Sequence, residues 1–377
     1  MSHLSFMEKL LEGVDVKWKP LGEVTGYEQP TKYLVKSTNY DDEFFTPVLT
    51  AGKNFILGYT DETDGIYKAS EKPVIIFYDF TTANKWVDFD FKVKSSAMKM
   101  ITSSNESEYL QKYIYYWLNT LPNELIDGDH KRQWISNFAK KEIPVPSPDI
   151  QAEIVRILDT FTALTAELTA ELTAELTARK KQYNYYRDQL LTFEEGEVEW
   201  NALGDVGEIL RGTAITKKET NPGEVPVVAN GPSHNYYHDK SNRSGETIVI
   251  ARSGAYAGLV SYWNKPIFLT DAFSIHPENK VLRSKFLYYV LKKDQIKIHL
   301  MSKGAGVPHV RAKDFESYKI PVPPLEEQTR IVAILDKFDT LTNSISEGLP
   351  REIELRQQQY EYYREQLLSF PKVESQA

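Results

Sequence analysis

The chain has 377 residues, a formal net charge of −8 and no cysteine, and 41% of its residues are hydrophobic. This length suits two or more globular domains, and the lack of cysteine excludes disulfide bonds and thiolate metal sites and agrees with a reducing cytoplasm. No apolar run approaches the length of a membrane span, and residues 1–13 show no secretory pattern. The acidic balance disfavours a nucleic-acid partner overall, but residues 200–319 carry an excess of lysine and arginine.

Residues 1–142 are expected to form a first globular head. A period-two alternation predicts a strand over 87–93 (VDFDFKV), and an apolar run predicts a second strand at 75–77. The first head ends in a polar, basic stretch, GDHKRQWISNFAKKE (128–142). An extended Ile-Pro-Val-Pro segment follows, because proline restricts its own backbone and that of the residue before it.

Residues 143–195 are expected to continue from this segment into one long helix that contains a repeated four-residue word. Three TAEL words fill 165–176, and no glycine or proline lies between Gln151 and Phe193. Thr and Glu alternate with Ala and Leu, as in a half-buried strand, but Ala, Leu and Glu are strong helix formers, so we interpret the tract as helical. Steps of four residues overshoot a helical turn by ~40°, which gives a drifting leucine stripe that favours packing against another helix. The stripe comprises Leu164, Leu168, Leu172 and Leu176.

Residues 196–319 are expected to form a second head, and residues 320–377 a second helical segment. Strands are predicted at 248–250 and 267–275. The second head also ends in a basic stretch, SKGAGVPHVRAKDFESYK (302–319).

The two helical segments are copies of each other. Residues 143–193 (IPVPSPDIQAEIVRILDTF…QYNYYRDQLLTF) and 320–370 (IPVPPLEEQTRIVAILDKF…QYEYYREQLLSF) align without a gap, and about half of their positions are identical. A glycine and a proline at 348–350 predict a kink or break in the second copy. Trp200 follows the first copy. Trp18 would follow the second copy in the same way if the C-terminus were joined to the N-terminus, so we expect the two termini to lie close together.

The two heads share a scaffold but not their loops. The apolar strand at 75–77 corresponds to that at 248–250, whereas the loops that follow are DFTTANK (79–85) and RSGAYAG (252–258). Similar scaffolds with different loops suggest two sites for different targets, and near-identical helices suggest two equal docking surfaces. Duplex DNA is such a target, since half-sites about one helical turn apart lie ~34 Å from each other.

The paired IPVP segments, the circular repeat and the TAEL words resemble the specificity subunit of Type I restriction–modification enzymes, and the words near the middle are similar to the subfamily called type IC. The resemblance covers the whole chain, and the stretch from YEQPTKYLVK to FTTANKWVDFDFKVKSSAMKM also resembles target recognition domains of that subfamily. It implies an α+β fold with two globular target recognition domains, 1–142 and 196–319. An antiparallel pair of long helices, 143–195 and 320–377, would separate them with pseudo-twofold symmetry.

The resemblance further implies a DNA-recognition subunit without catalytic residues. It would read an asymmetric bipartite site on double-stranded DNA and dock two modification (methyltransferase) subunits, joined by two restriction (translocase and nuclease) subunits. S-adenosylmethionine, ATP and Mg²⁺ would serve these partners, with no cofactor or metal in this subunit. In agreement, the chain lacks an adenine-methyltransferase tetrapeptide, a complete GxGxxG fingerprint and a phosphate loop. The alternative is a coiled-coil scaffold with protein- or carbohydrate-binding heads; an enzyme with an unrecognised site lacks any supporting motif.

In that family the number of words goes with the length of the unread DNA spacer. The second copy lacks the word, so a spacer role applies only to 165–176. We infer that each word moves the far head by ~6 Å along the helix and rotates it by ~40°. One base pair of DNA rises by ~3.4 Å and twists by ~35°. The two rotations therefore agree, whereas the two distances do not. A slipped-replication tract without a role is the alternative.

Candidate DNA-binding side chains come from the basic stretches and the strand-end loops. Arginine and lysine can bind guanine edges, but most such side chains hold phosphate, and a solvated basic loop is an alternative for each residue. The candidates are Lys131, Arg132, Thr81, Thr82 and Lys85 in the first head and Arg252, Ser253, Lys303, His309 and Arg311 in the second. Partner docking is proposed for repeated tyrosines of the helices, with core packing as the favoured alternative: Tyr183, Tyr186, Tyr360 and Tyr363.

Overall fold

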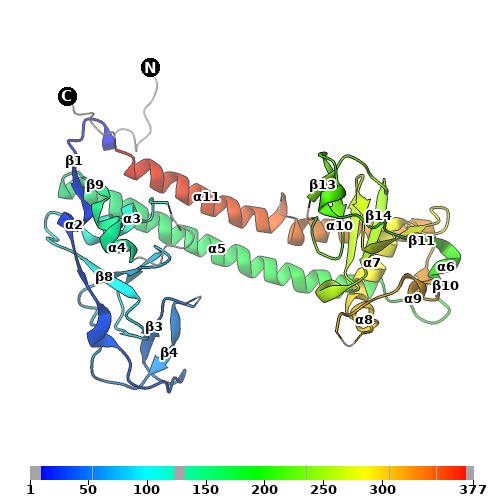
Figure 1. Ribbon diagram of the computed structural model, residues 1–377, viewed down its shortest axis with the longest axis horizontal. Coiled ribbons are helices and arrows are strands. Elements are labelled where there is room, and N and C mark those ends of the chain that lie inside the picture. The colour runs from blue at the N-terminus through cyan, green and yellow to red at the C-terminus, as the bar shows by residue number, and fades with distance from the viewer. Residues whose placement is uncertain are drawn as a thin grey trace. The chain divides into compact units, whose positions relative to one another are not determined.

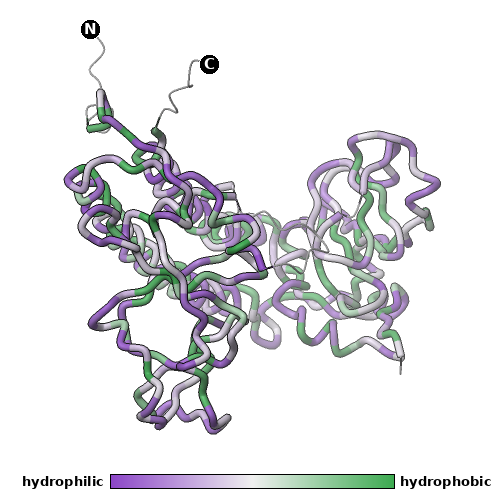
Figure 2. Tube along the Cα trace, turned by 60° about the vertical axis from the view of Figure 1, so that its left-hand side comes forward, coloured by the Kyte–Doolittle hydropathy of each residue, from purple (hydrophilic) through white to green (hydrophobic). Residues whose placement is uncertain are grey.

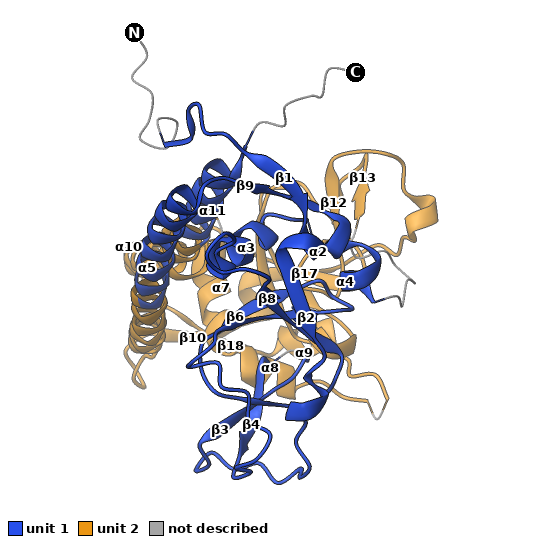
Figure 3. Cartoon of the chain, turned by 90° about the vertical axis from the view of Figure 1, so that its left-hand side faces the viewer, with its two compact units in different colours: residues 1–170, 354–377 blue, residues 171–353 orange. Residues whose placement is uncertain are grey.

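The computed structural model describes residues 10–52, 54–122, 132–234, 236–304, 306–344 and 346–370. The chain forms two compact units, which Figure 3 shows in separate colours: unit 1 contains residues 1–170 and 354–377, and unit 2 contains residues 171–353. Unit 1 therefore includes both ends of the chain, and Leu10 and Phe370 belong to one hydrophobic cluster within it. The described ends of the chain therefore share one unit and one hydrophobic cluster, in agreement with the expectation that they lie close together.

Unit 1 contains a four-stranded antiparallel sheet with the strand order β2-β8-β5-β6. A three-stranded sheet, β4-β3-β7, packs on one face of it, and a separate ribbon pairs β1 with β9. The strands are β1 (Lys17–Pro20), β2 (Thr25–Glu28), β3 (Thr46–Leu49), β4 (Ile56–Thr60), β5 (Val74–Tyr78), β6 (Asn84–Val87), β7 (Lys92–Val93), β8 (Met98–Ser103) and β9 (Glu142–Val145). The short helices are α2 (Leu21–Val24), η1 (Pro30–Tyr33), α3 (Gln111–Leu118), α4 (Gln133–Ser136) and η2 (Phe138–Lys140).

Unit 2 repeats this topology. Its four-stranded sheet has the order β11-β17-β14-β15, its three-stranded sheet the order β13-β12-β16, and its ribbon pairs β10 with β18. The strands are β10 (Glu199–Ala202), β11 (Gly207–Arg211), β12 (Val225–Val228), β13 (Tyr236–His238), β14 (Glu246–Ala251), β15 (Val260–Asn264), β16 (Phe268–Leu269), β17 (Ala272–Pro277) and β18 (Lys319–Val322). The short helices are α6 (Leu203–Val206), η3 (Lys217–Glu219), η4 (Gly254–Tyr256), α7 (Ser284–Lys293), α8 (Gln295–Leu300) and α9 (Ala312–Glu316). The mixed fold of helix and sheet with two repeated domains agrees with the predicted α+β class.

Strand β5 is apolar throughout, and β14 is apolar from Ile248 to Ala251, because both faces of each sheet are buried there. In β5, Ile75 and Phe77 belong to the cluster that contains the helices, whereas Ile76 and Tyr78 belong to the cluster under the three-stranded sheet. Alternate side chains of a strand point to opposite faces, so burial of both faces requires a continuous apolar run. Figure 2 shows hydrophobic stretches of the chain in both units. The predicted strands at 75–77 and 248–250 are confirmed as parts of β5 and β14.

Two longer segments were each predicted to form one strand, and this prediction is wrong because each segment is divided between two strands. The segment 87–93 is divided between β6 and β7, which belong to different sheets, and Asp90 between them binds Lys68 and Ser70. The segment 267–275 is divided between β16 and β17. Asp271 lies between these strands with φ of 42°, in the left-handed region that an extended strand cannot continue through.

Three long helices account for the copied segments: α5 (Pro148–Leu190), α10 (Leu325–Asn343) and α11 (Gly348–Leu368). The 43 residues of α5 form one continuous helix, as predicted (Figure 1). The predicted break in the second copy is also confirmed, since residues 344, 346 and 347 are not helical. Gly348 has φ of 78°, and an added Cβ would lie 2.5 Å from the Thr340 carbonyl oxygen, so this break requires glycine. None of the described helices combines the length and apolarity needed to cross a bilayer.

Each unit contains a pair of antiparallel helix segments held by the same aromatic contact. In unit 1, Phe161 of α5 packs on Tyr363 of α11 with ring centroids 5.5 Å apart. In unit 2, Tyr186 of α5 stacks on Phe338 of α10 at 5.6 Å. Phe161 and Phe338 are equivalent positions of the repeat, as are Tyr363 and Tyr186. The contact is therefore made twice. The first copy supplies the phenylalanine in unit 1 and the tyrosine in unit 2, and the second copy supplies the other ring each time.

The leucine stripe of the TAEL words is less buried than predicted. Leu164 is 49% exposed, and Leu168, Leu172 and Leu176 are only half-buried. The expectation of a helix–helix core is thus wrong for Leu164 and only partly met for the others. The physical reason is that a partner helix covers one narrow side of α5, while a stripe with four-residue steps drifts around the helix.

A buried glutamine fastens the start of each copied helix to its head. The amide of Gln151 accepts from Leu110 N–H (2.9 Å) and donates to the carbonyl oxygens of Glu108 (2.9 Å) and Pro146 (2.8 Å). In unit 2, Gln328 makes the equivalent three bonds to Arg283, Val281 and Pro323. Both glutamines are fully buried. The copied sequence therefore specifies how a helix attaches to its head.

Replacing Gln151 with alanine is expected to destabilise unit 1. The substitution leaves one backbone N–H and two carbonyl groups without their buried partner, and such a loss costs about 1–3 kcal/mol per unsatisfied group. Urea unfolding of the full chain measures the effect. Gln358→Ala, an exposed position of α11, is the matched control and should change the stability by less than about 0.5 kcal/mol. Equal effects of the two substitutions would contradict the role given to Gln151.

Candidate nucleic-acid interface

In the second head, predicted contact residues from distant parts of the sequence meet at the end of strand β14. Val310 N–H donates to the Arg252 carbonyl oxygen at 2.8 Å, and Ser253 forms a β-bridge with His309. Lys303 and His309 exchange two backbone hydrogen bonds of 2.9 Å each. The basic stretch before the Ile-Pro-Val-Pro strand is therefore bonded to the loop after β14. Three of the predicted residues, Arg252, Lys303 and His309, are exposed there, whereas Ser253 is buried beneath them.

A network of polar side chains holds Arg252 at this surface. The Arg252 guanidinium lies 2.8 Å from Oδ1 of Asp271. The Ser253 hydroxyl and the Asn230 amide N–H both donate to Oδ2 of Asp271, the former at 3.0 Å. Oδ1 of Asn230 accepts from the backbone N–H groups of Arg252 and Ser253 at 3.2 Å each. One carboxylate and one amide thus fix both the main chain and the side chain of Arg252.

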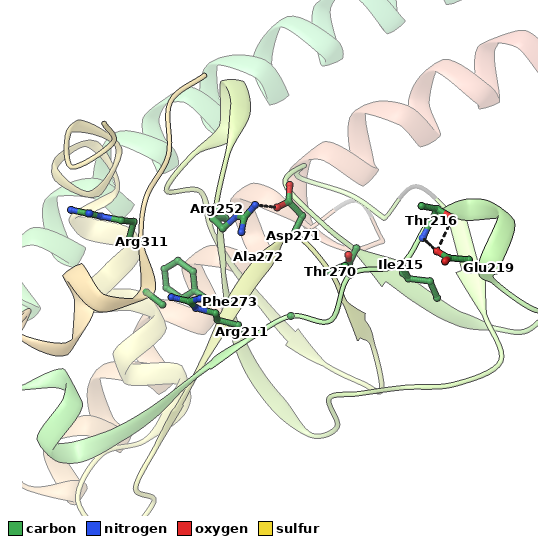
Figure 4. A pocket seen from close by; sticks show the side chains of 13 residues that line it. Arg211, Ile215, Thr216, Glu219, Arg252, Thr270, Asp271, Ala272, Phe273 and Arg311 are labelled. Carbon is green, nitrogen blue, oxygen red and sulfur yellow. Dashed lines mark hydrogen bonds and ion pairs between the residues drawn. The ribbon is translucent and has the colours of Figure 1, made fainter. Parts of the chain in front are cut away.

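Arg252 and Asp271 of this network line a cleft of about 640 Å³, which is also lined by two further arginines (Figure 4). Arg211 comes from the end of β11, Arg252 from the loop after β14, and Arg311 from the residue before α9. The two acids of the cleft are already bonded, because Asp271 binds Arg252 and Glu219 accepts from Thr216 N–H at 2.7 Å. Arg252 and Arg311 are themselves ion-paired, Arg311 with Asp314 at 3.2 Å, so they keep N–H groups mainly for hydrogen-bond acceptors, and Arg211 has no ion pair with a described residue.

The first head has an equivalent backbone hydrogen bond between its basic stretch and the loop after its central strand, and different side chains surround it. We call this hydrogen bond the backbone lock. Gln133 N–H donates to the Asp79 carbonyl oxygen at 3.0 Å, in the place of the bond between Val310 and Arg252. Oδ1 of Asp79 also accepts from Trp134 N–H at 3.1 Å. Asp79 therefore stands where the second head has Arg252. The expected correspondence of the two basic stretches is confirmed for their described residues.

A buried lysine lies behind this position in the first head. Nζ of Lys99 is 3.6 Å from Asp79, and both side chains are almost fully buried. With the amide oxygen of Gln29 turned toward them, it accepts from Lys99 (3.0 Å) and from Arg132 (2.9 Å). Burial lowers the pKa of Lys99, and the nearby Arg132 charge lowers it further, while Asp79 opposes both effects. The two cations meet at one amide oxygen, and only Arg132 reaches the surface.

The remaining candidates of the first head are placed less favourably. Thr82 is buried and has φ of 58°, so its side chain forms part of the turn after β5 rather than of the surface. Thr81 and Lys85 are exposed. Lys131 lies outside the described residues.

The tyrosine candidates divide between core and surface. Tyr183 is buried against Phe338. Tyr360 and Tyr363 are half-buried, and Tyr360 accepts a hydrogen bond from Thr162. Tyr186 is 41% exposed beside its contact with Phe338. The sequence prediction missed their neighbours Tyr185 and Tyr362, which are 61% and 58% exposed at equivalent positions of the repeat.

The sequence prediction also missed the residues that hold the site together. Asn230, Asp271, Gln29 and Lys99 are polar residues at strand ends, and nothing in their local pattern marks them. Arg211 carries a weak signal, because it ends an apolar strand of the more basic head. No group of three or more potential metal ligands of the histidine, cysteine, aspartate and glutamate types occurs in the described ranges.

Comparison with protein families gives two matches along the chain. Residues 13–178 and 196–355 each match the family of the Type I restriction modification DNA specificity domain. The chain is 54% identical to the EcoR124I/EcoR124II Type I restriction enzyme specificity subunit of Escherichia coli, with 100% of this chain and 99% of the relative covered. It is 33% identical to a putative Type I restriction enzyme specificity subunit of Haemophilus influenzae, with 97% and 98% covered.

Solved structures share the fold at low sequence identity. The crystal structure of the Type I restriction–modification S subunit of M. genitalium matches with a TM-score of 0.59 and 18% identity over 96% of this chain and 98% of that chain. A chain from a structural study of complex assembly in the Type I restriction–modification system matches with a TM-score of 0.60 and 18% identity over 95% and 98%. The two-unit α+β architecture is therefore shared with these chains.

Proposed function

The chain belongs to the Type I restriction–modification DNA specificity family, and from this membership we infer that it recognises DNA sequence for a Type I restriction–modification complex. The relative that is 54% identical over the full length is itself a specificity subunit. The alternative of a coiled-coil scaffold with protein- or carbohydrate-binding heads is not favoured, because the family match covers both heads.

We propose that the two heads read different halves of an asymmetric bipartite site. The observation that carries this proposal is the backbone lock at the end of the central strand, which is the same in both heads and presents different side chains. The first head exposes Arg132 there and buries Asp79, whereas the second exposes both Arg252 and His309. Different donors and acceptors on one scaffold select different base edges, since each base pair offers its own pattern in the major groove.

The proposed partners are two modification subunits, with two restriction subunits joining them. Their docking surface would include the exposed tyrosines of the copied helices, Tyr185, Tyr186 and Tyr362, which offer aromatic area twice on equivalent helix segments. S-adenosylmethionine, ATP and Mg²⁺ belong in this proposal to the partners, and this chain supplies recognition alone. A cytoplasmic location, where such a complex meets DNA, is part of the same proposal.

The complete complex is expected to bind DNA far more tightly than the chain alone. The net charge of −8 gives the isolated chain little attraction for phosphate, and phosphate contacts supply most of the sequence-independent affinity. Gel-shift titration at physiological salt, with the chain alone and with its modification subunits, measures the difference on duplexes from the methylated sites of cells that carry the system. We expect at least about a 100-fold difference in Kd, of the size that several phosphate contacts contribute. A duplex with both half-sites scrambled is the control. Equal retention of cognate and scrambled duplexes by the complex would refute sequence recognition.

A further inference from the structure

Resting on the proposed function, we propose that Arg252 reads a guanine in the half-site of the second head, and that Asn230 and Asp271 are positioning residues that hold its guanidinium for this contact. The network around Arg252 supports this assignment. A solvated basic loop needs neither a strained backbone at Asp271 nor a hydrogen-bond network that fixes its arginine.

The network fixes Arg252 at both ends. Asn230 binds the backbone N–H groups of residues 252 and 253, and Asp271 binds the guanidinium at 2.8 Å. Asn230 also donates to Asp271, so the main-chain anchor and the side-chain anchor are joined to each other. An arginine loses much rotamer entropy when it is held in one geometry, and here the fold has already imposed that loss.

The fold accepts backbone strain at the centre of this network. Asp271 has φ of 42°, one of two positive values among the described non-glycine residues, and it occupies the gap between β16 and β17. Such conformations cost about 1–3 kcal/mol and persist where surrounding structure requires them. The strained backbone places the Asp271 carboxylate between Ser253 and Arg252, as Figure 4 shows for Asp271 and Arg252.

The charge balance favours a base over a phosphate. With a carboxylate 2.8 Å away, the positive charge of Arg252 is largely compensated, which weakens its attraction for an anion. The remaining N–H groups of the guanidinium keep their hydrogen-bonding geometry, and the side chain is 54% exposed toward the cleft. Guanine presents two neutral acceptors, O6 and N7, that match two N–H groups of an arginine. Arg211 lines the same cleft and has no ion pair with any described residue, so it is the better phosphate ligand.

The first head cannot make this contact from the equivalent position. Asp79 stands there, buried, with its carboxylate bonded to Trp134 N–H and facing Lys99. The guanine contact therefore belongs to one half-site, which contributes to the asymmetry of the target.

The test uses the complex of the full chain with its modification subunits and duplexes that carry the mapped site with one base pair replaced at a time in the second half-site. Wild type should discriminate against replacement of one guanine by about 5- to 150-fold in Kd, the range of a bidentate arginine contact. Arg252→Ala and Arg252→Lys should both abolish this preference and leave the preferences of the first half-site intact. Asp271→Asn should reduce it, although Arg252 is still present, because the guanidinium is no longer held.

Arg211→Ala is the matched control, an arginine of the same cleft without a fixed partner. It should weaken binding to all duplexes by the same factor and lower the slope of log Kd against log salt by about 0.9, the change expected for one lost phosphate contact. If Arg252→Ala behaves like Arg211→Ala, Arg252 holds phosphate and the assignment is wrong. Full discrimination by Asp271→Asn would remove the positioning role. A wild-type complex without any sequence preference would instead overturn the proposed function.

Discussion

Deleting one four-residue word, Thr169–Leu172, is expected to change the target of the complex by about one base pair of unread spacer and to leave both half-sites unchanged. The deletion removes ~6 Å of helix and rotates the C-terminal remainder of the helix by ~40°, close to the ~35° twist of one base pair. These residues lie within the uninterrupted helix α5, and none of them belongs to the hydrogen-bond networks around Asp79 and Asp271. Methylation of the original site should fall by roughly 100-fold or more, since losing the register of one half-site costs as much as several mismatched base pairs.

Sequencing of methylated DNA from cells that carry the variant measures this outcome directly. Insertion of a single alanine after Ala170 is the control, because it rotates the downstream part of the helix by ~100° and advances it by only ~1.5 Å, a combination that no added base pair matches. We expect the insertion to abolish specific methylation and the word deletion to redirect it. A word deletion that alters the bases of either half-site, or that leaves the spacer as it was, would show that the tract does not set the spacing.

Trp134→Ala is expected to destabilise unit 1 by about 3–5 kcal/mol, the usual cost of removing a large aromatic side chain from a packed core. Trp134 is 1% exposed, and its ring packs against Phe77 of β5 with centroids 5.0 Å apart. The backbone N–H of residue 134, which binds the Asp79 carboxylate, remains in the variant. Loss of the packed ring should nevertheless let this backbone segment shift and loosen that contact. Discrimination in the first half-site should therefore weaken before the chain unfolds.

Hydrogen exchange measured by mass spectrometry separates the two units. Peptides of unit 1 should lose protection in Trp134→Ala while those of unit 2 keep it, because the large core of each unit contains residues of that unit alone. Phe315→Ala is the reciprocal control: Phe315 is fully buried in unit 2 and packs on Phe273. Loss of protection in both units by either substitution would show that the two cores are not independent.

The sequence identified the segments of the candidate site but not its internal contacts. Arg252, Ser253, Lys303 and His309 were predicted from their place in two basic or strand-end segments, and they do meet. Asp271, on which the geometry of Arg252 depends, was not predicted. Asp271 holds Arg252 from a left-handed backbone position between two strands. A local apolar pattern in the sequence does not reveal such a backbone conformation.

Several features were predictable from the order of the residues alone: the duplication, the continuous helix α5, the break before α11 and the apolar runs in β5 and β14. These features depend on helix propensity, on glycine and proline, and on repetition, all of which act over a few residues or are visible as copied letters. Other features became evident only from the folded chain. They are the division of β6 and β7 between two sheets, the partial burial of the TAEL leucines, and the hold of Asn230 and Asp271 on Arg252. Such pairings join residues that are distant along the chain, and burial and hydrogen-bond geometry select them only when the whole unit has folded.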